Sequence, residues 1–389
     1  AGLGTVALFD TGVGDVNRQD IDNLTSGRKL GFDFAIEDAV FSFSAQTRAA
    51  DVADQLYMFA AKLGMPRWDA APVLRAKAAG KLYYQSFATS PFGVLQRDLE
   101  YLITDKDPRF ATAGPEQLEQ VTPEGFREPW EPLLAQGPIE VLVFGEIDRT
   151  ATVEALRRTF GALPQRDAIP DDVAGRVTSF PIGSDDATVV NHRGDANQAA
   201  AVIAWPSGGG IDNLRESRQL QILTRIFNNR LLEAMRERAG ASYAPQVSAT
   251  WPVDMPTGGR ITAVAQLQPD DVPVFFNEAE KIAEDLVANP PGNDELLRAT
   301  EPLRQYINRA STGSTFWLRE LQGASFDPRR VTLTRTLTQD FSITTPQRMQ
   351  ALAARYLGGI EGWRLAIIPE GAELATLDPA LEVSQPVRA

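Results

Sequence analysis

The chain has 389 residues, a length that predicts two domains rather than one. Apolar residues make up 43% and charged residues 23%, which is typical of a globular protein and excludes a disordered or fibrous chain, and no apolar run is long enough to predict a membrane span. The net charge of −13 argues against a nucleic-acid partner, because an acidic surface repels phosphate.

Cysteine and histidine are scarce, and this limits the possible chemistry. Without cysteine there is no thiol nucleophile, disulfide or cysteine-bound metal. His192 is the only histidine, whereas a catalytic zinc normally takes two or three imidazoles. The chain is therefore predicted to bind no metal itself, and His192 is interpreted as a strand-end or surface residue. A self-sufficient hydrolase that uses His192 stays open as a weaker alternative.

The first half of the chain predicts a strand region followed by helices. Residues 35–46 have the alternating or continuous apolar character of strands. Apolar residues at helical spacing, Pro-containing turns and Thr-Pro start signals predict helices over 50–64, 70–87 and 123–135. The apolar run IEVLVFG, residues 139–145, is expected to close this half as a buried strand.

The second half predicts the same order, preceded by additional strands. Asp212 is the expected N-cap of a long helix that ends at Gly240. The other expected helices cover 272–288, 293–311 and 346–357. The expected strands lie near 177–183, 187–191, 198–205, 244–250, 260–268 and 363–368.

The two halves are diverged copies of one unit. Leu74-Arg75-Ala76 recurs 223 positions later as Leu297-Arg298-Ala299, and Thr122-Pro123 recurs as Thr345-Pro346 at the same offset. We therefore predict two homologous units, 1–165 and 166–389, joined by a Pro- and Asp-rich linker near 163–176. Consecutive helices between hairpin strands indicate an α+β fold, in which a mostly antiparallel sheet carries helices packed on one face.

The first copy lacks counterparts of the strands that open the second copy. We expect that about 40 residues of a complete first copy precede Ala1, so that the chain is the C-terminal part of a longer polypeptide or a cleavage product. A sheet without those strands is predicted to expose an edge that something else covers.

One polar pair in the second copy has the chemistry of a binding site. Arg236 is expected on the last turn of the long helix, and Tyr243 at the start of the following strand. A guanidinium and a phenol hydroxyl together could hold a peptide carbonyl or stabilise an oxyanion. From spacing alone, a structural interpretation is favoured, in which Arg236 is a helix-dipole partner and Tyr243 a half-buried strand residue.

The segment NNRLLEAMRERAGASYAPQVSATW, residues 228–251, resembles the pitrilysin/insulinase family of zinc peptidases, which includes the mitochondrial processing peptidases. That family has an Arg and a Tyr seven positions apart in its C-terminal half, as Arg236 and Tyr243 are here. The first copy has Asn23 and Leu30 at about the matching positions, so we interpret it as structural. The resemblance implies two-unit halves that close around a chamber.

The resemblance also implies a zinc site on another part of the enzyme. The family's metal motif, His-x-x-Glu-His, is absent from this chain, so zinc is expected on an N-terminal half or a partner subunit. The implied function is the substrate-binding half of a zinc-dependent endopeptidase that hydrolyses peptides in a closed chamber. Arg236 and Tyr243 would bind the substrate, and the chain alone would be inactive. The alternative is a non-catalytic scaffold or peptide-binding subunit of the same fold.

Three further points follow from the sequence. Gly208-Gly209-Gly210 is interpreted as a plain turn, with a substrate-contacting loop as the alternative. The run Thr315-Phe316-Trp317-Leu318 is interpreted as core, with chamber lining as the alternative. A periplasmic location is expected from the resemblance, with the cytoplasm as the alternative.

Overall fold

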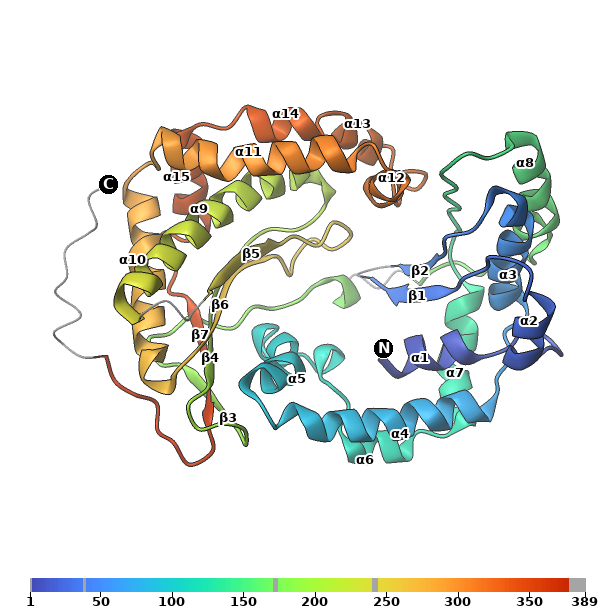
Figure 1. Ribbon diagram of the computed structural model, residues 1–389, viewed down its shortest axis with the longest axis horizontal. Coiled ribbons are helices and arrows are strands. Elements are labelled where there is room, and N and C mark those ends of the chain that lie inside the picture. The colour runs from blue at the N-terminus through green and yellow to red at the C-terminus, as the bar shows by residue number, and fades with distance from the viewer. Residues whose placement is uncertain (1, 38–39, 171–173, 240–243, 378–389) are drawn as a thin grey trace. The chain divides into compact units, whose positions relative to one another are not determined.

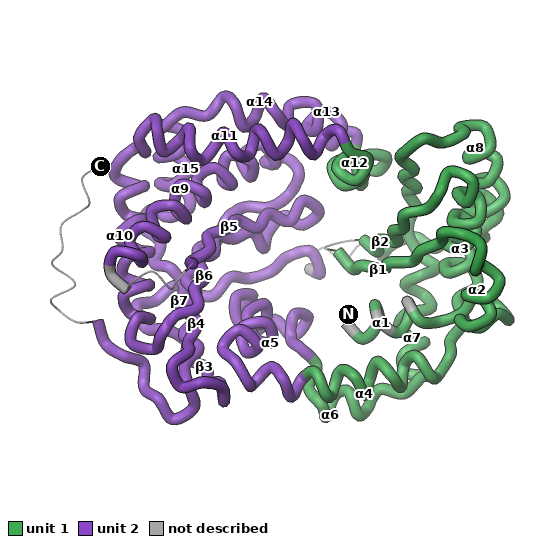
Figure 2. The backbone as a smooth tube through the Cα atoms, viewed as in Figure 1, with its two compact units in different colours: residues 1–83, 113–173, 313–327 green, residues 84–112, 174–312, 328–389 purple. Residues whose placement is uncertain are grey.

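The computed structural model describes residues 2–37, 40–170, 174–239 and 244–377. It is a mixed structure of helices and mostly antiparallel sheet, so the predicted α+β class is confirmed. The chain forms two compact units, each built from separate stretches of sequence (Figure 2). Unit 1 contains residues 1–83, 113–173 and 313–327. Unit 2 contains residues 84–112, 174–312 and 328–389.

Unit 2 is organised around a five-stranded sheet with the order β3-β7-β4-β6-β5. The strands are β3 (Thr188–His192), β4 (Ala199–Pro206), β5 (Gln246–Thr250), β6 (Arg260–Leu267) and β7 (Trp363–Pro369). β3 runs parallel to β7 and the other pairs are antiparallel. β4 is central, and residues 199–205 are fully buried.

Helices cover both faces of the central strand. On one face, α10 (Val272–Ala288) contacts β4, and Phe227 of α9 (Leu214–Ala239) packs against Trp205. On the other face, Val94, Leu95 and Ile103 of α5 (Pro91–Ile103) join Val202 and its neighbours in one core. The order of elements predicted helices on one face. It did not predict α5 on the other face, because α5 comes from the first half of the chain.

Unit 1 has a smaller sheet, a hairpin of β1 (Asp33–Ile36) and β2 (Phe41–Ser44). Its core gathers apolar side chains from the hairpin, α1 (Gly2–Asp10), α4 (Ala70–Phe87) and α7 (Pro123–Ala135) (Figure 1). Phe34 lies edge-on to Phe43 and to Trp130, with ring centroids 5.2 and 6.0 Å apart. Aromatic packing therefore replaces much of the sheet that unit 2 contains.

The remaining helices connect and cover these elements. They are α2 (Arg18–Leu24), α3 (Val52–Gly64), α6 (Pro115–Gln120), α8 (Arg149–Arg158), α11 (Asn293–Ala310), α12 (Ser314–Glu320), α13 (Arg329–Arg335), α14 (Leu337–Ser342) and α15 (Pro346–Tyr356). Short 3₁₀ turns lie at Ala49–Asp51, Pro108–Phe110, Phe160–Ala162, Ala174–Arg176, Ile211–Asn213 and Pro269–Asp271. No helix within the described residues is both long enough and apolar enough to cross a bilayer.

The elements follow the repeat seen in the sequence. α4 and α11 begin and end 223 positions apart, and Thr122 and Thr345 both cap a helix through the side-chain oxygen. α5 packs in unit 2, whereas α12, its counterpart, belongs to unit 1. Each copy thus contributes one helical segment to the unit that consists mainly of the other copy. The predicted repeat boundary near residue 165 stays a prediction, since these units are defined by contacts and not by the repeat.

Three local predictions were wrong. Residues 177–183 and 139–145 form no strand, although both runs are apolar. For 139–145 the reason is the absence of a neighbouring strand among the described residues, because an extended segment needs a hydrogen-bonded partner to become part of a sheet. Asp212 does not cap α9: it lies in the preceding 3₁₀ turn, and its carboxylate binds Arg329.

A buried lysine fixes the end of α1 in unit 1. Lys62 on α3 is 5% exposed, and its ammonium group donates to the carbonyl oxygens of Leu8, at 3.1 Å, and Thr11. It also lies 4.8 Å from the centre of the Phe32 ring. These contacts satisfy carbonyl groups that the end of a helix leaves unpaired. Burial lowers the pKa of Lys62 from 10.5 to about 8.

This shift predicts a pH window in which Lys62 changes the stability of unit 1. Between pH 8 and 10.5 the unfolded chain binds more protons at this position than the folded chain does. The free energy of unfolding therefore increases as the pH rises through this range. The gain is at most about 3 kcal/mol. Urea unfolding of wild type and Lys62→Met at several pH values in this window measures it. The wild type should gain stability relative to the variant as pH rises, and parallel curves would contradict the assignment.

Candidate functional site

The long helix α9 is the platform of the candidate site. Its apolar residues recur at helical spacing, and seven of them are almost fully buried: Leu220, Ile222, Leu223, Ile226, Phe227, Leu231 and Met235. The buried stripe reaches Met235, one residue before Arg236. The last turn of α9 is therefore held by core packing and does not depend on helix propensity.

The strand after the candidate site is tied to the same helix. The side-chain oxygen of Asn228 on α9 accepts a hydrogen bond from the backbone N–H of Val247 on β5, with the two atoms 2.9 Å apart. Pro245, just before β5, is buried. Figure 1 shows β5 beside α9, and the two elements are in contact. Both ends of the 236–243 segment are thus anchored in the unit 2 core.

Arg236 and Arg230 lie on the same helix and have different surroundings. Arg230 is bound to Asp285 at 2.6 Å and to Glu295 at 2.8 Å, and its hydrogen bonds lower the pKa of Glu295. Arg236 is exposed and forms no ion pair with another described residue. Arg230 therefore holds α9 to α10 and α11, whereas the Arg236 guanidinium has its donors available for a ligand.

The second residue of the predicted pair is Tyr243, which lies outside the described residues, as does the expected helix-ending Gly240. The structure brings Asn228 of α9 and Val247 of β5 together. The pairing of Arg236 with Tyr243 stays a prediction. Sequence reasoning missed Asn228, whose role is visible only once α9 and β5 lie side by side.

The donor set of this chain does not fit a zinc site. His192 ends β3 and is fully buried; its Nε2 atom lies 2.7 Å from the Gln198 carbonyl oxygen, and its Nδ1 atom accepts the Gly194 N–H at 3.0 Å. Both ring nitrogens are therefore occupied, which also removes the basis for a hydrolase that uses His192. Within the described ranges, no three His, Cys, Asp or Glu side chains gather as metal ligands would.

The glycine run after β4 is a packed turn. Gly210 has a φ of 78°, which favours glycine, and its carbonyl accepts the Trp251 indole N–H at 2.9 Å. A β-carbon on Gly208 would lie 2.3 Å from the Trp251 ring, and one on Gly209 would lie 2.6 Å from the Met255 carbonyl oxygen. Packing against residues 251–256 thus explains all three glycines. In the 315–318 run only Phe316 is buried, whereas Thr315 and Trp317 are exposed and Leu318 is half-buried, so the core interpretation holds for Phe316 alone.

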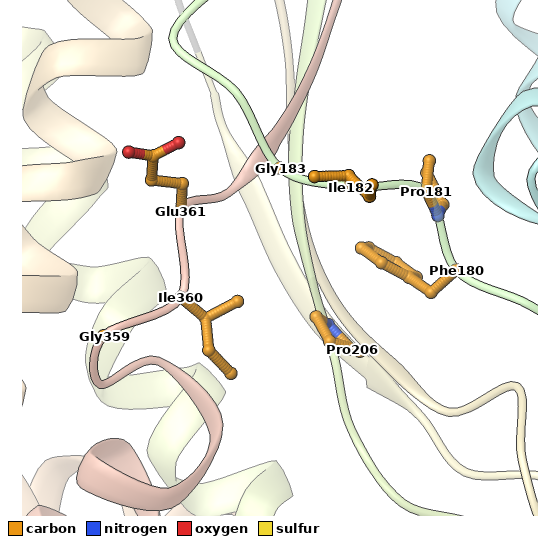
Figure 3. Close-up of a pocket in the computed structure, with 8 residues that line it drawn as sticks. All are labelled: Phe180, Pro181, Ile182, Gly183, Pro206, Gly359, Ile360 and Glu361. Atoms are coloured by element: carbon orange, nitrogen blue, oxygen red, sulfur yellow. The ribbon is translucent and has the colours of Figure 1, made fainter.

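Unit 2 also contains an apolar hollow that sequence reasoning missed. It has a volume of about 450 Å³ and is formed by residues 180–183, Pro206 and residues 359–361 (Figure 3). Phe180 and Ile360 point into the space, whereas the Glu361 carboxylate turns away. Ile182 is 93% exposed. The hollow lacks a nucleophile and an acid–base pair, so it can bind apolar groups but offers no catalysis.

Comparison with known proteins finds a family model that is similar to one central segment. Residues 121–303 match the family model of the peptidase M16 inactive domain. This range includes α9, Arg236 and β5. A comparison with curated proteins gives no significant match.

Solved structures extend the likeness to nearly the whole chain. The periplasmic protease PqqL from Escherichia coli superposes with a TM-score of 0.77 at 12% identity, over 95% of this chain and 40% of that protein. A protease from Helicobacter pylori gives 0.75 at 13% identity, covering 95% and 89%. A peptidase M16 inactive domain from Pseudomonas fluorescens gives 0.75 at 15% identity, covering 96% and 89%. At these identities the likeness shows a shared fold, and the chain spans less than half of the E. coli protease.

The anchor between α9 and β5 can be tested with two adjacent asparagines. Asn228→Ala removes the acceptor for the Val247 N–H and should lower the free energy of unfolding by about 1 kcal/mol. Asn229 is exposed and its side chain forms no hydrogen bond to another described residue, so Asn229→Ala is the matched control. Urea unfolding of both variants gives the comparison. Equal losses would show that the Asn228 contact does not hold the strand.

Proposed function

We propose, from the match of residues 121–303 to the peptidase M16 inactive domain, that this chain is the substrate-binding half of a zinc-dependent endopeptidase. One observation carries the proposal: Arg236 is exposed, without an ion pair to any other described residue, near the end of a helix whose other face is buried. The Asn228 contact ties β5 to the same helix, and Pro245 just before β5 is buried. Such a cation on a rigid support is suited to binding a peptide.

The chemistry follows from the donors of the two side chains. The Arg236 guanidinium can donate two hydrogen bonds to a peptide carbonyl, and the Tyr243 hydroxyl can donate one. These bonds strengthen when negative charge develops on the carbonyl oxygen during hydrolysis. Donors held in advance lower the energy of that transition state more than they stabilise the bound substrate.

The proposal assigns the metal to another polypeptide segment. The occupied ring of His192 and the scattered carboxylates of this chain do not provide a zinc site. We assign zinc and the activating Glu to an N-terminal half or partner subunit with His-x-x-Glu-His. In this arrangement the present chain binds and orients the peptide, and by itself it is inactive.

Two substitutions test the assignment in the enzyme assembled with its zinc-bearing partner. Arg236→Ala and Tyr243→Phe should each lower kcat/KM for a peptide by about tenfold or more, because each removes a donor to the developing oxyanion. Arg225→Ala is the control: Arg225 is exposed and lies 11 positions earlier, so it shares nearly the same face of α9 roughly 16 Å away. Peptide cleavage assays give the comparison.

The same assay distinguishes the alternative function. Unchanged turnover in both variants would contradict the substrate-binding role and favour a non-catalytic scaffold of the same fold. The match to a family model described as an inactive domain is the observation that favours the non-catalytic scaffold. Zinc analysis of the separate subunits then shows whether the metal belongs to the partner.

We also propose a periplasmic location. The E. coli protease with this fold is periplasmic, and an acidic chain without cysteine is compatible with export. Osmotic-shock fractionation of cells that produce the tagged full-length gene product should recover it with periplasmic markers. Recovery with cytoplasmic markers would reject this location.

A further inference from the structure

A short segment, residues 177–183, lies against one end of the unit 2 sheet without forming a strand. Arg109 donates to the Val177 carbonyl oxygen at 2.7 Å and fixes the start of the segment. At the other end, a β-carbon on Gly183 would lie 1.8 Å from the Glu361 carbonyl oxygen, so the segment contacts the chain that leads into β7. The segment is therefore held at both ends.

Two hollows meet along this segment. The apolar hollow described above is lined by residues 180–183, Pro206 and residues 359–361 (Figure 3). A second hollow, with a volume of about 200 Å³, also has Phe180 and Pro206 in its wall. Its other walls come from the end of α5, from the start of the segment and from the turn between β5 and β6. Because two residues line both spaces, one small ligand can reach into each of them.

The second hollow, here called the hydroxyl hollow, is rich in hydrogen-bond donors. Thr178 lines it and is 8% exposed, and its Oγ1 atom has no hydrogen-bond partner among the described residues. The Thr257 Oγ1 atom accepts the Thr178 N–H at 2.8 Å, so the Thr257 hydroxyl hydrogen remains to donate. Gly258 has a φ of 95°, and a β-carbon there would lie 2.6 Å from Thr178 Oγ1. A buried hydroxyl without a partner costs free energy, and a ligand that accepts its hydrogen removes this cost.

A guanidinium lies in the same hollow. Arg260, at the start of β6, lines it, and its side chain is 15% exposed. Arg260 pairs with Glu100 of α5, but this hydrogen bond leaves other N–H groups of the guanidinium to donate. None of the described residues that line the hollow is Asp or Glu. The complementary ligand is therefore an anion with more than one acceptor atom, and a carboxylate meets this requirement.

The segment also leaves its backbone available. The N–H and C=O groups of Ser179 and Phe180 form no hydrogen bond with the backbone of another described residue. Backbone groups of this kind pair readily with the backbone of an added peptide. The segment thus offers a peptide contacts that a simple alkyl carboxylate cannot make.

We propose that the two hollows together bind the C-terminal residue of a peptide whose last side chain is apolar. The terminal carboxylate accepts hydrogen bonds from Thr178, Thr257 and Arg260. The last side chain fills the apolar hollow against Phe180 and Ile360. A peptide end carries both groups on one Cα atom, which matches two hollows that share a wall. The choice of a peptide rests on the proposed function, since a fatty acid carries the same two groups.

Peptides that differ only at their last residue test the site on the full chain. A dye-labelled peptide of Gly and Ser that ends in Leu with a free carboxylate should bind saturably in fluorescence anisotropy. The same peptide with a C-terminal amide lacks the negative charge and should bind at least about tenfold more weakly. A version that ends in Gly lacks the apolar side chain and should also lose about tenfold. Octanoate should compete at least about tenfold more weakly than the unlabelled Leu peptide, because it forms no backbone hydrogen bonds.

Two buried threonines provide a matched pair of variants. Thr178→Val removes the hydroxyl from the hydroxyl hollow and should weaken binding of the free-acid peptide by about fivefold or more. Urea unfolding should show no loss of stability, because this hydroxyl has no partner among the described residues. Thr262 on β6 is also 8% exposed with an unpartnered Oγ1, and it lines neither hollow. Thr262→Val should therefore leave the affinity within about twofold.

A second pair of variants tests the apolar hollow. Ile360→Ser should weaken binding of the Leu peptide by about fivefold and leave binding of the Gly peptide within about twofold. Ile343, at the end of α14, is exposed and lines neither hollow, so Ile343→Ser is the control. Circular dichroism confirms that all variants are folded.

Four results would overturn the proposal. They are the absence of saturable binding to the folded wild type, equal binding of the acid and amide peptides, equal effects of Thr178→Val and Thr262→Val, and competition by octanoate as strong as by the Leu peptide. The last result would assign the site to an alkyl carboxylate and not to a peptide. Each readout is binding to the chain without its zinc-bearing partner. Failure here is thus separate from failure of the proposed function, which is measured by peptide cleavage.

Discussion

The complete burial of β4 is the constraint on which the rest of unit 2 depends. Its backbone pairs on both sides, with β6 and β7, so every position must be extended and hydrogen-bonded. Helices cover both faces, so its side chains must be apolar; small residues at 199–201 and 204 allow the helices to approach closely. Once β4 is in place, the positions of α5, α9 and α10 follow. The end of α9 then presents Arg236 at the surface of a rigid core.

The two units place one sequence pattern in different surroundings. In unit 2, β7 is buried and hydrogen-bonded on both sides, whereas the similar run 139–145 in unit 1 forms no strand. Unit 1 fills part of its core with aromatic rings around Phe34 and Trp130, and a buried lysine holds α1. An apolar segment therefore becomes a strand only where a neighbour accepts its backbone bonds.

This asymmetry also separates the roles of the two units. Arg236 belongs to the unit with the five-stranded sheet, where the buried stripe of α9 holds the helix that carries it. Oxyanion binding requires donors that are positioned before the reaction, because moving them into place would consume the energy gained. Unit 1 has no comparable pair, since Asn23 and Leu30 occupy the related positions.

The sequence by itself determined the α+β class, most helices, the 223-residue repeat and the position of Arg236 on the last turns of a long helix. These features depend on local periodicity, Thr-Pro starts and composition, which need no partner. Only the tertiary structure decided that α5 packs in unit 2 and its counterpart α12 belongs to unit 1, that Asn228 holds β5, and that 139–145 is no strand. Each of these depends on which distant segment supplies the neighbour for a hydrogen bond or an apolar face. The sequence pattern of a segment can show that the segment needs a neighbour, but it does not show which distant segment that neighbour is.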